Sequence, residues 1–254
     1  MRNALAVLSL LLFTGCFEIE QSIELKKDLS GTAAFHLGVD LEPMIVVMAQ
    51  VGREMEGKTG PATEEEIALA KAEFRKKAST EESSEPTREE IQKSLPEGVT
   101  LIDYSTEERD LGMASDFRFA FDRLSALTGV KLPSKKGGDP TQENVVDNPF
   151  EGLEVSEDGD TLTIRSKPQN PTETVEEKTK DGPPMDPAVE KLMRGAFEKM
   201  RVVYRIKAPF EVLSHNATRR EGDTLVWEYD LKAFEAMEKS GRIDDAQVRV
   251  TYRR

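Results

Sequence analysis

Apolar and polar residues alternate with a period of two in several short segments of the chain. Residues 17–26 and 32–39 alternate in this way and are joined by a turn that contains Gly31, a pattern typical of a β-hairpin. The clearest strand spans 111–121, with one face made of Leu111, Met113, Ser115, Phe117, Phe119 and Phe121. Its other face is polar, which indicates one face in the core and one in water. Residues 99–104 are predicted to be its antiparallel neighbour.

Helical periodicity appears between these strands. Residues 41–55 place Leu41, Met44, Ile45, Met48, Val51 and Met55 on one face, as an amphipathic helix does. These methionines could form an adaptable binding stripe, but we expect core packing. Thr63 and Glu66 have the spacing of a capping box at the start of a thinly apolar, surface helix, and residues 87–90 repeat the pattern.

The last third of the chain combines a hairpin, a helix and further strands. Turn residues Glu157-Asp158-Gly159-Asp160 between two apolar pairs predict the hairpin, and Asp186-Pro187 starts the helix. Strands are expected at 201–207, 211–218, 223–229 and 246–253. We read Pro-, Gly- and charge-rich loops at 133–148 and 167–185. The sum predicts an α+β domain with a predominantly antiparallel sheet and a helical insertion at about 41–95.

The N-terminus has the layout of an export signal. Arg2 precedes a ten-residue stretch, 4–13, that is apolar except for Ser9 and is too short for a membrane-spanning helix of about 20 residues. Thr14-Gly15-Cys16 then resembles the lipobox of bacterial lipoproteins, with Phe13 where Leu is usual. The resemblance implies cleavage between Gly15 and Cys16, removal of residues 1–15, and diacylglyceryl and N-acyl groups, palmitate among them, on Cys16.

This leader defines where the mature chain works. Residues 16–254 are expected to form a single extracytoplasmic domain on a lipid anchor in the cell envelope, facing the periplasm or the exterior. Phe17 stands where an Asp favours retention in the inner membrane of some Gram-negative bacteria, which points toward the outer membrane. Cys16 is the only cysteine, so no intrachain disulfide can form.

Charge narrows the class of partner. The chain has a net charge of −13, and removal of residues 1–15 takes away Arg2 and no acid, which leaves −14. Such a surface repels phosphate backbones and anionic headgroups. We therefore expect no nucleic-acid partner and a membrane attachment that depends on lipid more than on a basic patch.

The sequence gives little support for catalysis. The only histidines, His36 and His215, lie in expected strands, where a structural role is usual. No zinc spacing, calcium loop, nucleophile elbow, Walker pattern or dinucleotide pattern occurs. With 48 acidic residues, no carboxylate pair can be singled out for glycoside hydrolysis. We expect a non-enzymatic protein with no metal and no cofactor beyond its acyl groups.

Two stretches resemble the LppM-type bacterial lipoproteins. The first leads from the strand after Cys16 to Asp28-Leu29-Ser30-Gly31, and the second, 209–227, contains Asn216, Gly222 and Trp227. The resemblance implies an extracytoplasmic α+β domain, with lipid or glycolipid binding proposed for the mycobacterial namesake. The chain departs from the pattern at Leu29, where Gly is common, and by lacking a C-terminal membrane helix. We expect structural roles for these residues: turns, a strand end and a core side chain.

Three functions remain open from the sequence. The first is a non-enzymatic lipoprotein that binds a lipid, glycolipid or envelope component on an apolar surface near the Phe117, Phe119 and Phe121 face and the methionine-bearing helix. The second is an assembly lipoprotein that docks on an envelope protein complex through residues 41–95. The third is a hydrolase of envelope polymers, which would need an acid pair in a deep cleft.

Overall fold

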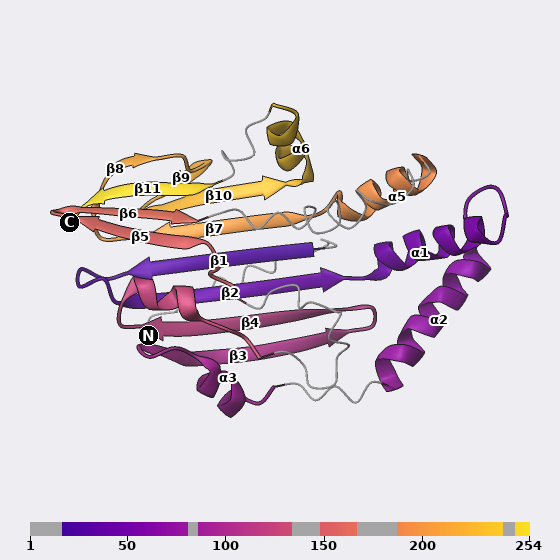
Figure 1. Ribbon diagram of the computed structural model, residues 1–254, viewed down its shortest axis with the longest axis horizontal. Helices are drawn as coiled ribbons and strands as arrows, with labels where there is room; N and C mark the ends of the chain where they lie inside the picture. Colours follow the sequence, from indigo (N-terminus) through magenta and orange to yellow (C-terminus); the bar gives the residue numbers. More distant parts are fainter. Residues whose placement is uncertain (1–16, 81–85, 134–147, 167–186, 241–246) are drawn as a thin grey trace, which may run out of the picture.

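The computed structural model describes residues 17–80, 86–133, 148–166, 187–240 and 247–254. Strands in these residues form two mostly antiparallel sheets, and helices lie around and beyond them (Figure 1). The predicted α+β class is therefore confirmed. Cys16 and the leader, together with the expected loops 133–148 and 167–185 except for a few end residues, lie outside the described residues.

The larger sheet has seven strands in the order β3-β4-β2-β1-β7-β10-β9. In that order they are Val99–Arg109, Gly112–Phe121, Gly31–Asp40, Phe17–Leu25, Arg201–Lys207, Thr224–Asp230 and Arg219–Glu221. Neighbours are antiparallel except β1 and β7, which run parallel with Glu18 opposite Arg201. The strand nearest the N-terminus thus lies in the middle of the sheet.

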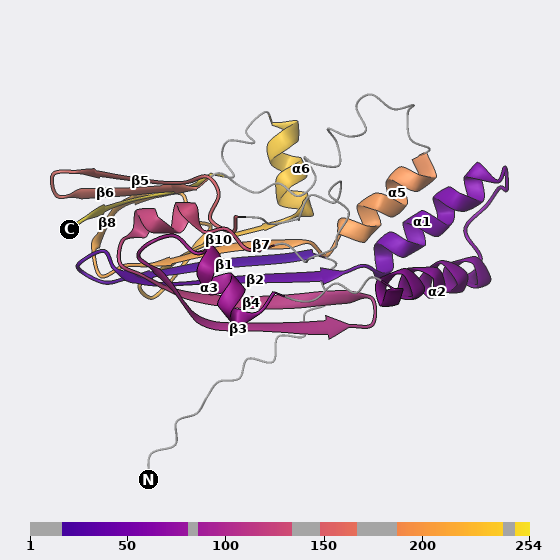
Figure 2. The same cartoon turned by 60° about the horizontal axis from the view of Figure 1, so that its bottom comes forward.

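The smaller sheet has four antiparallel strands in the order β5-β6-β11-β8. They are Leu153–Asp158, Thr161–Ser166, Val248–Arg253 and Glu211–His215. This sheet lies over one face of the larger one (Figure 2). A single apolar core joins them, with Phe119 and Trp227 from the large sheet and Leu162 and Val250 from the small one, all fully buried.

Three short helices close this core. α3 (Arg88–Ser94) buries Ile91, η1 (Leu124–Gly129) buries Leu127, and α6 (Leu231–Lys239) buries Phe234. The Thr87 hydroxyl accepts a hydrogen bond from the backbone N–H of Glu90 and starts α3, which is the predicted capping box. Asp230 caps α6 in a similar way by accepting from the N–H of Ala233.

Three further helices extend beyond one end of the large sheet (Figures 1 and 2). They are α1 (Glu42–Met55), α2 (Glu64–Thr80) and α5 (Pro187–Phe197), and we call them the helical arm. Val47 of α1 and Ala196 of α5 are buried together, with Leu192 packed against them. The arm therefore has its own small core, separate from the core between the sheets.

The structure corrects two predictions. The expected strand 211–218 ends early, at His215 of β8, and the chain then leaves the small sheet and enters the large sheet as β9. Helix α6 was not predicted. It begins directly after β10, at Leu231, so no loop in the sequence separates the apolar residues of the strand from those of the helix. Within the segment 41–95, predicted as a helical insertion, α1 and α2 belong to the helical arm, whereas Ile91 of α3 packs into the main core.

Candidate functional site

The described structure starts one residue after the proposed anchor. Phe17 is the first residue of β1 and is only 8% exposed. It pairs with Val39 of β2, and α1 begins three residues after Val39, at Glu42. Cys16 and Gly15 are outside the described residues, whereas Phe17 lies at the end of the sheet from which the helical arm extends.

Ion pairs hold the helical arm together and fix it to the sheet. Arg53 of α1 donates two hydrogen bonds to the Glu66 carboxylate, at 2.8 and 2.9 Å. At the other end of α2, Arg75 donates to both oxygens of Asp110, at 2.8 and 2.6 Å, in the β3–β4 turn. Asp110 and Arg75 stabilise each other's charge, so hydrogen bonding lowers the pKa of Asp110 and raises that of Arg75.

The arm carries the most exposed apolar side chains of the described residues. Met48 is 63% exposed and Met55 85% exposed on α1, and Leu69 is 62% exposed on α2. The predicted core face of this helix is therefore only partly right: Ile45 is buried, and Val47 and Gln50 are buried in place of the outer methionines. The reason is that α1 packs mainly against two helices, α2 and α5.

The phenylalanine face of β4 is core. Phe117 is 8% exposed, and Phe119 and Phe121 are more deeply buried. Phe119 contacts Phe150 edge to face, with ring centroids 6.1 Å apart. These side chains fill the space between the sheets, so the apolar surface expected there is instead found on the arm.

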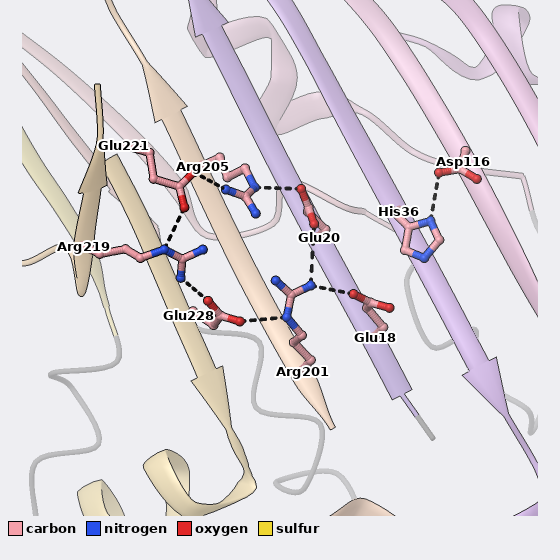
Figure 3. Close-up of polar contacts among 9 residues, drawn as sticks. All are labelled: Glu18, Glu20, His36, Asp116, Arg201, Arg205, Arg219, Glu221 and Glu228. Carbon is pink, nitrogen blue, oxygen red and sulfur yellow. Dashed lines mark hydrogen bonds and ion pairs between the residues drawn. The ribbon is translucent and has the colours of Figure 1, made fainter. Parts of the chain in front are cut away.

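The face of the large sheet opposite the core carries a network of ion pairs (Figure 3). Side chains alternate along a strand, so Ile19 and Ile23 enter the core while Glu18 and Glu20 lie on the opposite face. We call the following seven residues the ion-pair network: Glu18, Glu20, Arg201, Arg205, Arg219, Glu221 and Glu228. They come from four adjacent strands, β1, β7, β10 and β9.

Arg201 is the centre of the ion-pair network. Its guanidinium donates to Glu18 at 2.7 Å and to Glu228 at 2.8 Å, while Glu20 lies 3.8 Å away. Arg205 donates to Glu20 at 2.8 Å and to Glu221 at 3.1 Å. Glu18 is only 4% exposed, so its charge depends on Arg201 for compensation.

The other half of the network centres on Arg219. It donates to Glu221 at 2.8 Å and also to Glu228. Burial raises the pKa of Glu228, but hydrogen bonds from Arg201 and Arg219 outweigh it and lower that pKa overall. Hydrogen bonding from Arg219 likewise lowers the pKa of Glu221. A general acid needs a raised carboxyl pKa. The lowered pKa values of Glu221 and Glu228 instead suit ionised groups that stabilise the sheet through ion pairs.

The two histidines have local partners. His36 Nδ1 lies 2.8 Å from Asp116 Oδ1 across β2 and β4, on the same face as the ion-pair network (Figure 3). His215 Nδ1 accepts a hydrogen bond from the N–H of Ala217 at 3.1 Å. Within the described ranges, no group of three or more His, Cys, Asp or Glu residues is arranged to hold a metal ion.

The residues of the family resemblance lie in separate turns and strands. Asp28 accepts from the N–H and hydroxyl of Ser30, at 3.1 and 2.7 Å, which lowers the pKa of Asp28. Gly31 follows in the same turn, where an added Cβ would lie 2.0 Å from the Glu24 carbonyl oxygen. Gly222 has a φ of +61° in the β9–β10 turn, a conformation that glycine adopts without strain.

Asn216 and Trp227 form one polar contact between the sheets. The indole N–H of the fully buried Trp227 donates to Asn216 Oδ1 at 2.8 Å. The same oxygen accepts from the backbone N–H of Arg249 at 2.9 Å, and Asn216 Nδ2 donates to the Gln247 carbonyl at 2.5 Å. Asn216 therefore connects β10 of the large sheet with β11 of the small one.

Sequence reasoning missed the ion-pair network. The signal was present as charged residues at alternate positions of two expected strands, Glu18 and Glu20 in one and Arg201 and Arg205 in the other. What was missing was the parallel pairing of β1 with β7. Separately, no helix in the described part of the chain is long and apolar enough to cross a membrane.

No protein-family model and no curated protein matches the sequence. Solved structures do match, among them the folded domain of the Mycobacterium tuberculosis protein LppM, determined by NMR. That domain has 10% sequence identity and a TM-score of 0.43, over 94% of this chain and 88% of that chain. The function of this chain therefore has to be argued from its own residues.

Proposed function

We propose that this chain is a bacterial cell-envelope lipoprotein, anchored in a membrane through acyl groups on Cys16, that binds an envelope component without catalysing a reaction. The apolar run that ends at Thr14-Gly15-Cys16 supports the anchor, as does the presence of a single cysteine. The observation that carries the proposal is that β1 begins directly after Cys16. A lipid at that position attaches the folded sheet to the membrane with no spacer.

The arrangement of apolar surface supports a binding role at the membrane-proximal end. The aromatic side chains of β4 are used in the core, whereas Met48, Met55 and Leu69 are exposed on the arm next to the anchored end of the sheet. Apolar side chains that share one exposed surface mark interaction sites, and these three belong to two helices that pack together, α1 and α2. A lipid, a glycolipid or another envelope component is the ligand class that fits this place.

Intact mass spectrometry of the protein purified from its native membrane tests the anchor. We expect a chain that starts at Cys16 and carries added acyl mass, and a Cys16→Ser variant without that mass that leaves the membrane fraction. Because Cys16 precedes the first strand, the variant should keep the circular dichroism spectrum of the wild type. An unmodified wild-type chain, or one that retains residues 1–15, would show that the anchor is wrong.

Lipid extraction tests the ligand. The acylated protein, purified in mild detergent, is extracted and its lipids are identified by mass spectrometry beside the Cys16→Ser variant. Co-purifying lipid that exceeds the covalent acyl groups, and that returns when envelope lipid is added back, is the expected result. Recovery of the covalent groups alone, with no binding of added lipid, would contradict a lipid ligand.

A second candidate function is assembly on an envelope protein complex. The observation that favours it is the exposure of Leu69 and the long surface of α2, which lie within the predicted docking segment 41–95. Crosslinking in cells from a position on α2 should then yield a discrete adduct with a second protein. Recovery of monomer alone would count against this candidate.

A further inference from the structure

The geometry points to a second membrane contact: the exposed face of α1 formed by Met48 and Met55 lies in the interface of the bilayer that holds the Cys16 lipid. This inference rests on the proposed anchor at Cys16. It adds the surface by which the folded domain meets the same membrane, with acyl chains and headgroups as the partner.

The first step is the short distance between the anchor and the arm. Phe17 pairs with Val39, and α1 begins at Glu42. Consecutive Cα atoms are about 3.8 Å apart, so Cys16 lies one such step from the first residue of the sheet. An acylated Cys16 therefore holds the base of the arm at the headgroups.

The second step is the direction of the arm. It continues outward from the anchored end and does not fold back over the sheet (Figures 1 and 2). α1 has 14 residues, a length of about 21 Å at a rise of about 1.5 Å per residue. A single lipid at Cys16 lets the domain adopt many orientations relative to the membrane. In those orientations in which the arm lies on the bilayer, the exposed methionines of α1 are also covered.

The third step is the chemistry of the α1 face. Met48 and Met55 are one heptad apart and so share one side of the helix, with exposed fractions of 63% and 85%. Flexible, apolar methionine side chains suit fluid acyl chains. Ile102 and Leu213, the other large apolar side chains exposed among the described residues, are each 41% exposed, and Leu213 belongs to β8, away from the arm (Figure 1).

The fourth step concerns charge. Basic side chains near the tip of the arm are paired with acids: Arg53 binds Glu66, and Lys58 contacts Glu56 at 2.7 Å. Paired in this way, they offer no net positive patch for anionic headgroups. The contact should therefore depend on apolar insertion and should not strengthen when anionic lipid is added.

The test uses the full acylated protein with a fluorescent label at one position. Cys16 is the only cysteine and its thiol is blocked by the lipid, so Met55→Cys supplies a single reactive thiol. Leu213→Cys is the matched control at an exposed apolar site far from the arm. Each labelled protein is placed in phosphatidylcholine vesicles with brominated acyl chains, and iodide is added to the water.

We expect brominated chains to quench the label at position 55 strongly and iodide to quench it weakly, with the reverse at position 213. If intact mass shows acylation but both labels behave alike, the arm contact is wrong and the anchor stands. If the protein carries no acyl groups, the anchor is wrong and the arm contact falls with it. A label at position 55 that is shielded in native membranes but open to iodide in vesicles would assign the arm to a protein partner instead.

Discussion

Asn216 joins the two sheets through one amide group. Its Oδ1 accepts from the Trp227 indole and from the backbone N–H of Arg249, and its Nδ2 donates to the Gln247 carbonyl. Trp227 is fully buried, so its N–H cannot form a hydrogen bond with bulk water when the Asn216 acceptor is lost. The contact therefore contributes to stability and fixes how the sheets are placed.

Replacing Asn216 by Ala should lower the free energy of unfolding by about 1 to 3 kcal/mol, the range for leaving a buried donor without its partner. Urea denaturation measures the change. A double-mutant cycle with Trp227→Phe gives the control, because that variant removes the indole N–H itself. If Asn216→Ala costs as much in the Trp227→Phe background as in the wild type, the indole contact does not explain the loss.

At this scale the sequence predicted some roles and missed others. Asn216, Gly222 and Trp227 stood out in the sequence, and the structure places them after β8, in the β9–β10 turn and in the core. The partners of Asn216 were not predictable, because Arg249 and Gln247 approach it from a strand more than thirty residues away. The exposure of Met48 could not be predicted either, since it depends on which helices pack beside α1.

Among the elements, β1, β7 and β10 are tied by the ion-pair network. Arg201→Met should lower the free energy of unfolding by about 3 kcal/mol, because it leaves the buried Glu18 carboxylate without compensation. Lys207→Met is the control on the same strand and the same face, where Lys207 and Glu24 are each about half exposed. Breaking that pair should cost about 0 to 1 kcal/mol; chemical denaturation measures both.

A double variant separates charge from packing in the same network. Glu18→Met combined with Arg201→Met removes the stranded carboxylate, and apolar replacement of a buried pair is often neutral. The double variant should therefore recover most of the stability that Arg201→Met loses. Equal stability of the single and double variants would show that the uncompensated charge of Glu18 is not the cause of the stability loss in Arg201→Met.

Glu66 gives the helical arm a defined response to acid. It accepts from the N–H of Thr63 at 2.9 Å, and this bond, with those from Lys58 and Arg53, lowers its pKa from 4.5 to about 2. A carboxyl whose pKa is lowered by folding stabilises the fold above its unfolded pKa. The contribution of Glu66 is thus complete above pH 4.5 and is lost as the pH falls toward 2.

Thermal melts between neutral pH and pH 2 measure that loss. The stability difference between wild type and Glu66→Gln should be largest above pH 4.5 and shrink toward pH 2, because the glutamine does not titrate. Taking the difference cancels the other carboxyls, which titrate in both proteins. A difference that stays constant over this range would mean that the Glu66 charge does not stabilise the arm.

The elements themselves were largely predictable, and their pairing was not. Period-two alternation gave β1, β2 and β4 nearly to the residue, and capping boxes gave the starts of α2 and α3. Alternation says which face of a strand is apolar but not which strand lies beside it. The crossing of the chain from β8 to β9 was therefore missed, since both strands are short and mostly exposed.

For the whole molecule, the spacing between Cys16 and Phe17 should control how the domain meets the membrane. Insertion of ten Gly and Ser residues at this junction adds a flexible chain with an end-to-end distance of about 16 to 19 Å. The protein should stay acylated and folded, while the label at position 55 should lose its quenching by brominated lipid. Unchanged quenching would mean that the arm binds the bilayer without help from the nearby anchor.

The position of β1 in the middle of the large sheet also governs the order of events during biosynthesis. Glu18 is 183 residues before its partner Arg201, so the sheet cannot be completed until the last third of the chain has been made. Contacts this distant in sequence form slowly, so the sheet stays incomplete for most of the synthesis of the chain. Under the proposed anchor, acylation of Cys16 should precede the pairing of β1, because Phe17 is buried once β1 is paired. The proposal therefore predicts a protein that folds after its lipid has been attached.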